Sequence, residues 1–400
     1  MQKVYIAAAR RTATGSFNGS LSAIPAANFA AEVVKDILAS SKIPAADVSE
    51  LICGNILQAG AGQGPGRQVA IKAGIPCEVP AHSLNMLCGS GMKAVISAAL
   101  SIRAGFGEVY IAGGMENMSI APYVIPGARQ GLRLGNAEII DHTVYDALTD
   151  AFEGIHMGIT AENIAAKYGI SREAQDEFAI KSQEKAIAAV DSGKFKDEIV
   201  PIIIKQKKSE FVFDADEYPN RRTSLEKLAA LRPAFRKGGT VTAGNASGIN
   251  DGAAFLLVVS EAALEKYSLE PLVEVIGLGQ GGVEPSLMGL GPVPAVRNAL
   301  AMAGMKLADM DVLELNEAFA AQSLGVLKLL SEEHGLSQEE ILAKTNLQGG
   351  AIALGHPVGA SGARITVTLV HLMLREGFKY GLASLCIGGG MGTALILRRV

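Results

Sequence analysis

Short apolar runs alternate with longer segments of helical character along most of the chain. Runs rich in strand-forming residues predict β-strands at 4–9, 51–56, 109–114, 272–279, 312–318 and 383–390. Residues 26–40 repeat apolar side chains at helical spacing, 92–104 are apolar nearly all round, and further helices are predicted near 294–303 and 361–375. Because strands alternate with helices, the chain is predicted to be an α/β protein.

The segment 120–246 interrupts this alternation with charged and aromatic residues and with turn signals such as Tyr218-Pro219-Asn220. One helix is predicted in it, from Ala161 to about Lys194, with Thr160 and Asn163 as capping or turn residues. We therefore expect 120–246 to be an inserted loop domain.

The two ends of the chain resemble each other weakly. The matched pairs, in the same order, are 46–51 with 308–313, Gly89-Ser90-Gly91 with Ala360-Ser361-Gly362, and Gly113-Gly114-Met115 with Gly389-Gly390-Met391. Each half is thus predicted to hold a strand, a helix introduced by glycine, and another strand that ends in a Gly-Gly-Met turn. The N-terminal half would be 1–119 plus 247–270, and the C-terminal half 271–400.

Composition and charge narrow the class of protein. Hydrophobic residues make up 49% and charged residues 19%, and the 46 glycines favour elements that pack closely around a large core. A net charge of -4 gives no general case for a nucleic-acid or membrane partner. The apolar stretch in the N-terminal MQKVYIAAARRT is too short for the hydrophobic region of a signal peptide or for a membrane span, so a cytoplasmic protein is expected.

The cysteines carry the candidate chemistry. They lie at 53, 77, 88 and 386 without C-x-x-C spacing, so reduced thiols are expected in place of a zinc site or disulfides. Cys88 sits between a strand-like SLNM and a Gly-Ser-Gly helix start, where the helix dipole favours a thiolate. We interpret Cys53 and Cys77 as packing residues.

Three further segments could complete a site around Cys88. His356 lies in Gly355-His356-Pro357, a loop setting that suits a paired base. Cys386 is either strand core or part of the site, and the GGGMG behind it would supply bare backbone amides to an oxyanion. Asn316 lies at the end of the predicted strand 312–318 and is either a helix cap or an amide that holds water or ligand.

These segments, in this order, make the chain similar to the thiolase family. The similarity extends nearly end to end, through AGGMENMS (112–119), HMGITAENIA (156–165), VTAGNASGINDGAA (241–254) and AIALGHPVGASGAR (351–364). It implies the thiolase fold, in which duplicated βαβαβαββ halves form a five-layer αβαβα sandwich with buried helices between two sheets. His156-Met157-Gly158 resembles the biosynthetic branch, which condenses two acetyl-CoA molecules.

The resemblance also implies residue roles. Cys88 would take the acetyl group of acetyl-CoA as a thioester, with His356 accepting its proton, and Cys386 would then deprotonate the methyl group of a second acetyl-CoA. The carbanion would attack the acetyl-Cys88 carbonyl, giving acetoacetyl-CoA and coenzyme A. His356 with a water held by Asn316 would form one oxyanion site, and the N–H groups of Cys88 and Gly388 the other. No metal and no permanently bound cofactor are expected.

By the same resemblance, coenzyme A would lie across the loop domain. Its pantetheine would lie near His156, Met157 and Ser247, with Met157 limiting the acyl length. Arg221 and Arg222 would lie near the adenine and phosphate, although the family commonly has one arginine and a glycine there, so which arginine makes the contact stays open. The remaining pocket or coenzyme A contacts would be Phe235, Ala243, Met288 and Phe319.

Family members are dimers or, in the biosynthetic branch, tetramers, and 120–140 is the candidate tetramer contact. Two alternatives use the same fold: a degradative 3-ketoacyl-CoA thiolase of broader chain length, and a non-catalytic acyl-CoA carrier. A cysteine hydrolase is a third. The presence of Cys88, Asn316, His356 and Cys386 together argues against a carrier. A hydrolase needs no second cysteine, because it deprotonates no carbon.

Overall fold

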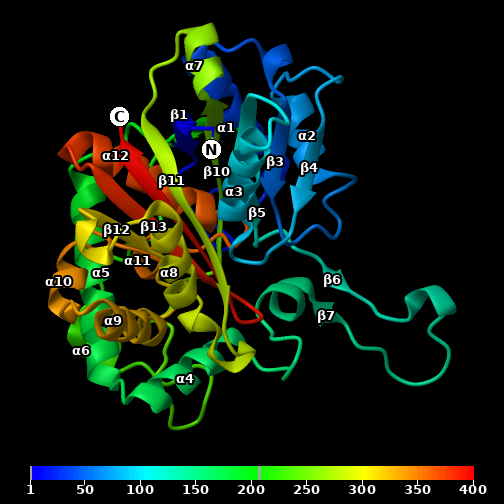
Figure 1. Ribbon diagram of the computed structural model, residues 1–400. Helices are drawn as coiled ribbons and strands as arrows, with labels where there is room; N and C mark the ends of the chain where they lie inside the picture. The colour runs from blue at the N-terminus through cyan, green and yellow to red at the C-terminus, as the bar shows by residue number, and fades with distance from the viewer. Residues whose placement is uncertain (1, 206–208) are drawn as a thin grey trace.

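A computed structural model describes residues 2–205 and 209–400 (Figure 1). Its main sheet has ten strands: β1 (Val4–Arg11), β2 (Gly15–Ser16), β3 (Glu50–Gly54), β4 (Ala81–Leu84), β5 (Val109–Asn117), β10 (Asn250–Ser260), β11 (Val273–Gly282), β12 (Val312–Leu315), β13 (Tyr380–Ile387) and β14 (Met391–Arg399). Two small hairpins pair β6 (Tyr123–Val124) with β7 (Ile140–Asp141) and β8 (Ile202–Lys205) with β9 (Glu210–Phe213).

The helices differ widely in length. The longer ones are α1 (Ala26–Ser41), α3 (Ser90–Arg103), α4 (Met157–Tyr168), α5 (Arg172–Asp191), α8 (Pro292–Ala303), α9 (Ala320–His334) and α12 (Ser361–Glu376). The shorter ones are α2 (Pro65–Lys72), α6 (Leu225–Ala229), α7 (Glu261–Tyr267), α10 (Gln338–Ala343) and α11 (Ala351–Leu354). None of the helices in the described part of the chain has the length and apolar character of a membrane span.

The strand order confirms the duplication. Along the sheet the order is β12-β13-β14-β11-β1-β10-β5-β3-β4, so equivalent strands of the two halves lie on either side of the β11–β1 junction. That junction is a short antiparallel contact that pairs Tyr5 with Glu274 and Ile6 with Val273. The two predicted sheets are therefore joined at one edge.

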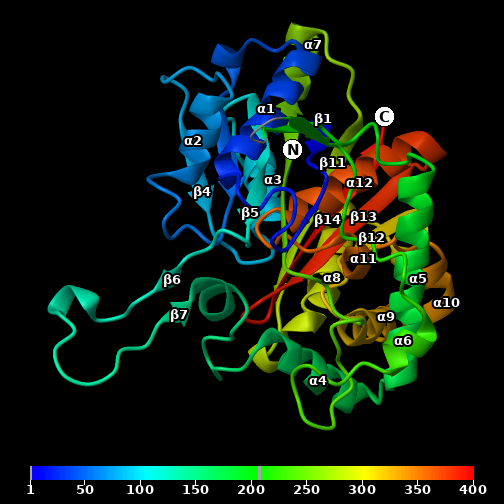
Figure 2. The same ribbon diagram turned by 180° about the vertical axis from the view of Figure 1, so that it is seen from behind.

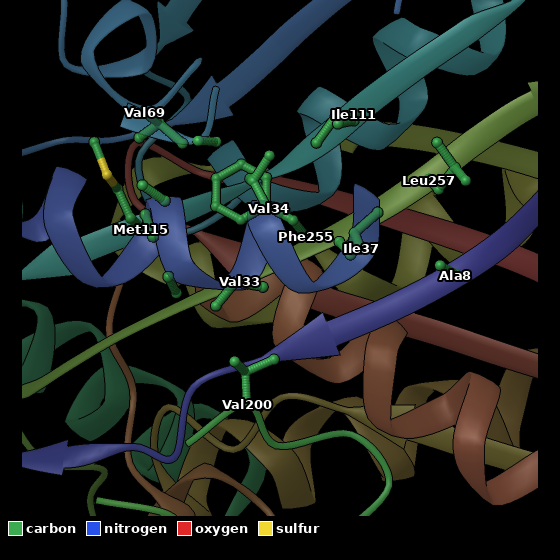
Figure 3. Close-up of a cluster of buried hydrophobic side chains, with 14 of the residues drawn as sticks. Ala8, Val33, Val34, Ile37, Val69, Ile111, Met115, Val200, Phe255 and Leu257 are labelled. Carbon is green, nitrogen blue, oxygen red and sulfur yellow. The ribbon is translucent and has the colours of Figure 1, made fainter. Parts of the chain in front are cut away.

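The layers follow from which faces are apolar. Helices α3 and α12 touch each other, and their side chains share one core with both sheets, including Met92, Ile365, Val258 and Leu395. On the outer faces, α1 covers the N-terminal sheet and α8 the C-terminal sheet. Figure 3 shows the outer N-terminal packing, where Val34 and Ile37 of α1 lie near Phe255 and Leu257 of β10. The five-layer αβαβα prediction is confirmed.

Two local predictions were wrong. Gly113, Gly114 and Met115 form no turn but lie inside β5, where the missing side chains allow close backbone approach: a Cβ at Gly114 would meet the Gly359 carbonyl at 2.1 Å. The single helix 161–194 is two helices, since Gly169 ends α4 in the left-handed conformation and Ser171 caps α5. The first of them begins at Met157, and its cap is His156 in place of Thr160 or Asn163.

An extended arm leaves the body between β5 and α4. The hairpin β6–β7 forms its base, and both views show the intervening loop projecting away from the layers (Figures 1 and 2). Its exposed apolar side chains are Tyr123, Ile125, Leu132, Leu134 and Ile139.

Candidate active site

Cys88 lies in a tight turn immediately before α3. Leu87 has a left-handed φ of 47°, and Ser90 closes the turn by donating to the Leu87 carbonyl at 2.6 Å and accepting from the Met86 N–H at 2.9 Å. A non-glycine residue with positive φ stores strain that the surrounding structure must support. The turn directs Cys88 into a cavity of about 300 Å³.

The sulfur of Cys88 is neutral at physiological pH. Burial raises the pKa of Cys88 to about 11, and the negative charge of Glu116 acts in the same direction. The backbone N–H groups of Gly388 and of Cys88 itself oppose the rise in that pKa, because both donate towards the sulfur. The predicted effect of the helix dipole on the thiol is therefore outweighed by desolvation.

His356 is fixed by the side chains of Asn250 and Ser361. Its backbone N–H donates to Asn250 Oδ1 at 2.9 Å, and a Cβ at Gly355 would lie 2.5 Å from the same side chain. Its Nδ1 lies 2.5 Å from Ser361 Oγ, whose hydroxyl donates to the Pro357 carbonyl. With that hydroxyl proton committed, Nδ1 carries the ring proton and Nε2 has a free lone pair.

The free Nε2 of His356 is buried and has no partner among the described residues. Burial, with a contribution from the positive charge of Arg364, lowers the pKa of His356 to about 3. A neutral imidazole with an unshared Nε2 lone pair can accept a proton from a thiol.

Cys386 is the second-last residue of β13 and lines the same cavity as Cys88. Burial raises the pKa of Cys386, and the proximity of Cys88 raises it further. Beyond it, Gly389 and Gly390 turn the chain with φ of 75° and 81°. That turn leaves the N–H of Gly388 directed at Cys88.

Asn316 follows β12 and is 1% exposed. Neither its Nδ2 nor its Oδ1 has a hydrogen-bond partner in the described ranges, whereas buried amides are normally paired. It forms no part of the cavity lining and no helix cap, because α9 begins after Phe319. Its amide is therefore available to a water or a ligand.

The cavity wall collects most of the predicted contact residues. It includes His156, Met157, Phe235, Ala243, Ser247, Met288 and Phe319, together with Cys88, His356 and Cys386. The 243–248 loop reaches the site by pairing with the Asn316-Phe319 segment, where the Ser247 N–H donates to the Ala318 carbonyl at 2.9 Å.

His156 presents a donor to the cavity. Its Nδ1 accepts from the Gly158 N–H at 3.0 Å, and burial lowers its pKa, so the neutral ring carries its proton on Nε2. The ring stacks on Phe235 with centroids 4.8 Å apart, and Phe235 in turn meets Phe319 edge-on. Gly158 is required there, since a Cβ would lie 2.2 Å from the Phe235 ring.

Arg221 and Arg222 lie outside the cavity wall, on the exposed surface before α6. Arg221 donates two hydrogen bonds to Asp191, at 2.5 and 2.9 Å. No ion pair of Arg222 occurs within 2–205 and 209–400. The two arginines are thus unequal in their freedom to meet an anion.

Sequence reasoning missed Tyr218 and Glu116. The sequence pattern at Tyr218 predicts only a turn, but Tyr218 lines the cavity and packs over Gly248.

Glu116 is fully buried and accepts from Asn55 Nδ2 and from the backbone N–H groups of Ile56, Leu57 and Gly359. It thereby links the loop after β3 to the loop that carries His356. Only the unusual placement of a charge in AGGMEN could have pointed to it.

No set of three or more His, Cys, Asp or Glu side chains in the described residues is arranged to hold a metal ion. The four cysteines form no disulfide in the structure. The site therefore presents a half-buried thiol at Cys88, a buried thiol at Cys386, a neutral imidazole, an unpaired amide and a backbone N–H pair.

Comparison with known proteins places these features in a family. Residues 4–262 match the thiolase N-terminal domain and 269–399 the thiolase C-terminal domain. The chain is 54% identical to an acetyl-CoA acetyltransferase of Chromobacterium violaceum, over 99% of this chain and 100% of that protein.

Solved structures agree over the whole length. An acetyl-CoA acetyltransferase from Syntrophomonas wolfei superposes with a TM-score of 0.97 at 41% identity, covering 100% of both chains. Human mitochondrial 3-ketoacyl-CoA thiolase in complex with CoA superposes with a TM-score of 0.93 at 42% identity, covering 100% of this chain and 98% of that one. With both halves matched from end to end, this chain belongs to the thiolase family.

Proposed function

We propose that this protein is an acetyl-CoA C-acetyltransferase, which reversibly condenses two acetyl-CoA molecules to acetoacetyl-CoA and coenzyme A. The observation that carries the proposal is the second thiol, that of buried Cys386, which shares one cavity with Cys88 and whose pKa is raised by the proximity of Cys88. Acyl transfer alone needs one nucleophile and one base, and a second thiol supplies the base for a carbon acid. The relatives named above as acetyl-CoA acetyltransferases support this substrate.

In the first half-reaction, Cys88 attacks the acetyl-CoA carbonyl while its proton passes to His356 Nε2. The tetrahedral oxygen is stabilised by the N–H groups of Cys88 and Gly388, which already converge on the sulfur. Coenzyme A leaves as a thiol with the proton of Cys386. The enzyme then holds acetyl-Cys88, an imidazolium at His356 and a thiolate at Cys386.

In the second half-reaction, the Cys386 thiolate removes a methyl proton from a second acetyl-CoA. Because burial makes this thiolate a strong base, its strength approaches what a thioester methyl group demands. The enolate oxygen accepts from His356 Nε2–H and from a water held by the unpaired Asn316 amide. The enolate carbon attacks acetyl-Cys88, and the departing Cys88 sulfur recovers its proton from His356.

Coenzyme A would bind across the loop domain, residues 120–246. His156 Nε2–H and Ser247 would face the pantetheine, and Met157 would close the acyl end of the pocket. The position of the Met157 sulfur, 3.6 Å from where a Cβ of Gly388 would be, supports this role. Arg222 would meet the phosphate, because Arg221 is held by Asp191. No resident cofactor takes part in these steps.

The assembly would be a homotetramer, formed as a dimer of dimers. The 120–140 arm projects from the body of the protein (Figure 1), and its exposed apolar side chains support this assembly, because a monomer would leave them in water. The half-buried edge strand β4 supports a dimer contact, because its outer edge has no partner strand in the described residues. A cytoplasmic location would suit two thiols that must stay reduced.

The test is intact-mass analysis and peptide mapping after mixing with acetyl-CoA alone, followed by a chase with free coenzyme A. One acetyl group on the Cys88 peptide, removed by the chase, is the expected result. Parallel rates on acetoacetyl-CoA and six-carbon 3-ketoacyl-CoA should favour the four-carbon substrate. No adduct on folded protein would indicate a carrier, and acetate release without acetoacetyl-CoA a hydrolase.

A further inference from the structure

Glu317 is a buried carboxylate next to Asn316 that faces away from the reaction cavity. It is 2% exposed, and it lines a separate cavity of about 170 Å³ beside α5. Its Oε2 accepts from Ser182 Oγ at 2.6 Å and from the Ile352 N–H at 3.4 Å, and its Oε1 accepts from Asn346 Nδ2 at 2.8 Å. One carboxylate therefore joins α5, the start of α11 and the segment after α10.

Asn346 brackets Asn316 from both sides. Its Oδ1 accepts from the Leu315 N–H at 2.9 Å, and its Nδ2 donates both to the Leu315 carbonyl at 2.7 Å and to Glu317. Asn346 has a left-handed φ of 47°, a strained conformation that its three hydrogen bonds support. The residues before and after Asn316 are thus held by one side chain, and Glu317 is the acceptor on the far side.

Ser182 adds a further hydrogen bond to the group formed by Glu317 and Asn346. Besides donating to Glu317, its hydroxyl accepts from the Gly350 N–H at 3.0 Å. Gly350 packs so closely that a Cβ would lie 2.2 Å from the Glu317 carboxyl carbon. The carboxylate therefore has little room to move.

The other reactive groups have further supports of their own, besides the bonds that Glu317 and Ser182 accept from the Ile352 and Gly350 N–H groups ahead of His356. His356 is held by Asn250 and Ser361, and the turn of Cys88 by Ser90. The side chain of Asn316, in contrast, makes no hydrogen bond within the described ranges, so its direction depends on its backbone. The contacts of Glu317 bear on Asn316 more directly than on the nucleophile.

We propose that Glu317, with Ser182 and Asn346, is a positioning residue that fixes Asn316 at the enolate oxygen. It acts on the carbon–carbon bond step and leaves the transfer of acetyl to Cys88 largely unchanged. This rests on the proposed function, because it assumes that both half-reactions occur. Outright removal of an oxyanion donor lowers the rate by about 100-fold or more. Displacement of Asn316 without its removal should therefore lower the rate by about tenfold to 100-fold.

The test compares two reactions in the Glu317→Gln variant. Exchange of labelled coenzyme A into acetyl-CoA reports acetyl transfer to Cys88, and thiolysis of acetoacetyl-CoA reports the carbon–carbon step. Glutamine keeps the size of the side chain but replaces one acceptor oxygen by a donor. We expect exchange to stay within about threefold, and the kcat for thiolysis to fall about tenfold or more.

Glu314→Gln is the matched control. Glu314 is a buried glutamate three residues before Glu317, on β12, and its Oε1 has no hydrogen-bond partner in the described part of the chain. Burial raises its pKa to about 8, so it is mainly protonated at neutral pH, and glutamine resembles that form. This variant should change neither reaction.

A double variant separates positioning from general damage. In an Asn316→Ala background, Glu317→Gln should cause no further loss in thiolysis, because the group it positions is absent. If Glu317→Gln does not fold, Ser182→Ala should show the same selective loss to a smaller degree.

An equal loss in both reactions, no loss in either, or additive losses in the double variant would overturn the positioning role. If the unmodified protein catalysed neither reaction, the proposed function itself would be wrong.

Discussion

The ionisation of Cys88 provides the sharpest test of the site. Burial raises the pKa of this thiol to about 11 while it lowers that of His356 to about 3, so the resting pair is thiol and imidazole. An imidazolium–thiolate pair, as in other cysteine enzymes, would require shifts of the opposite sign. The perturbation is a change in pH between 6 and 10 on the ligand-free protein.

The expected signal follows from the raised pKa. A rise from the ordinary 9.0 to about 11 is a penalty on the thiolate of about 3 kcal/mol, caused by lost solvation that two N–H groups offset in part. The thiolate fraction of Cys88 should be about one in 10⁵ at pH 6, one in 10³ at pH 8 and one in ten at pH 10. The proton therefore moves to His356 only as the sulfur attacks.

Thiolate absorbance near 240 nm measures this directly. The difference between the unmodified protein and a Cys88→Ser variant removes the contributions of tyrosines and of exposed Cys77. We expect no Cys88-dependent absorbance up to about pH 9 and the beginning of a rise by pH 10. A full thiolate signal already present at pH 6 would show that a preformed ion pair exists and that desolvation does not dominate.

The remaining predictions concern substrate length, coenzyme A, assembly and stability. Met157→Ala should raise the rate on six-carbon relative to four-carbon 3-ketoacyl-CoA by about tenfold, since it opens the acyl end of the cavity; unchanged relative rates would contradict this. Arg222→Ala should raise the KM for acetyl-CoA by about tenfold, whereas the matched Arg221→Ala, which breaks the pair with Asp191, should change it far less. Leu134→Asp at the exposed tip of the arm should convert a tetramer to dimers in light scattering, and an unchanged mass would argue against the arm as a contact. Burial raises the pKa of Glu116 from 4.5 to about 7, so the folded protein loses stability as pH rises from about 4.5 to 7. In denaturant titrations, the free energy of unfolding of the unmodified protein relative to that of Glu116→Gln should fall by at most about 3 kcal/mol over that pH range.

The fold was largely predictable because its elements are long and its repeat leaves marks in the sequence. The apolar 92–104 run became the buried helix α3, and the matched 308–313 and 46–51 segments both lead into parallel strands, β12 and β3. The Gly113-Gly114 pair was misread because a glycine pair indicates a turn by itself. Gly114 instead packs against the backbone at Gly359 and Gly113 against the backbone at Ala254, both more than 100 residues away in sequence.

Which atoms are satisfied and which are free could not be predicted. The sequence identified Asn316 and His356 as candidates. Only the structure shows that Asn346 bonds to the neighbouring Leu315 N–H and Ser361 to His356 Nδ1. The Asn316 amide and His356 Nε2 are left without partners among the described residues. Such pairing depends on residues distant in sequence. The hydrogen bonds of Glu116 could not be predicted for the same reason, since its partners come from two other loops.

Desolvation connects the chemistry of the two cysteines. The same burial that keeps Cys88 and Cys386 protonated at rest makes either thiolate strongly basic once formed. For Cys386 that basicity narrows the pKa gap to a thioester methyl group, and for Cys88 it makes the imidazolium of His356 necessary when the sulfur departs. A surface thiol with an ordinary pKa would ionise more readily but would be too weak a base for carbon deprotonation. The buried cavity therefore favours carbon–carbon bond chemistry over simple hydrolysis.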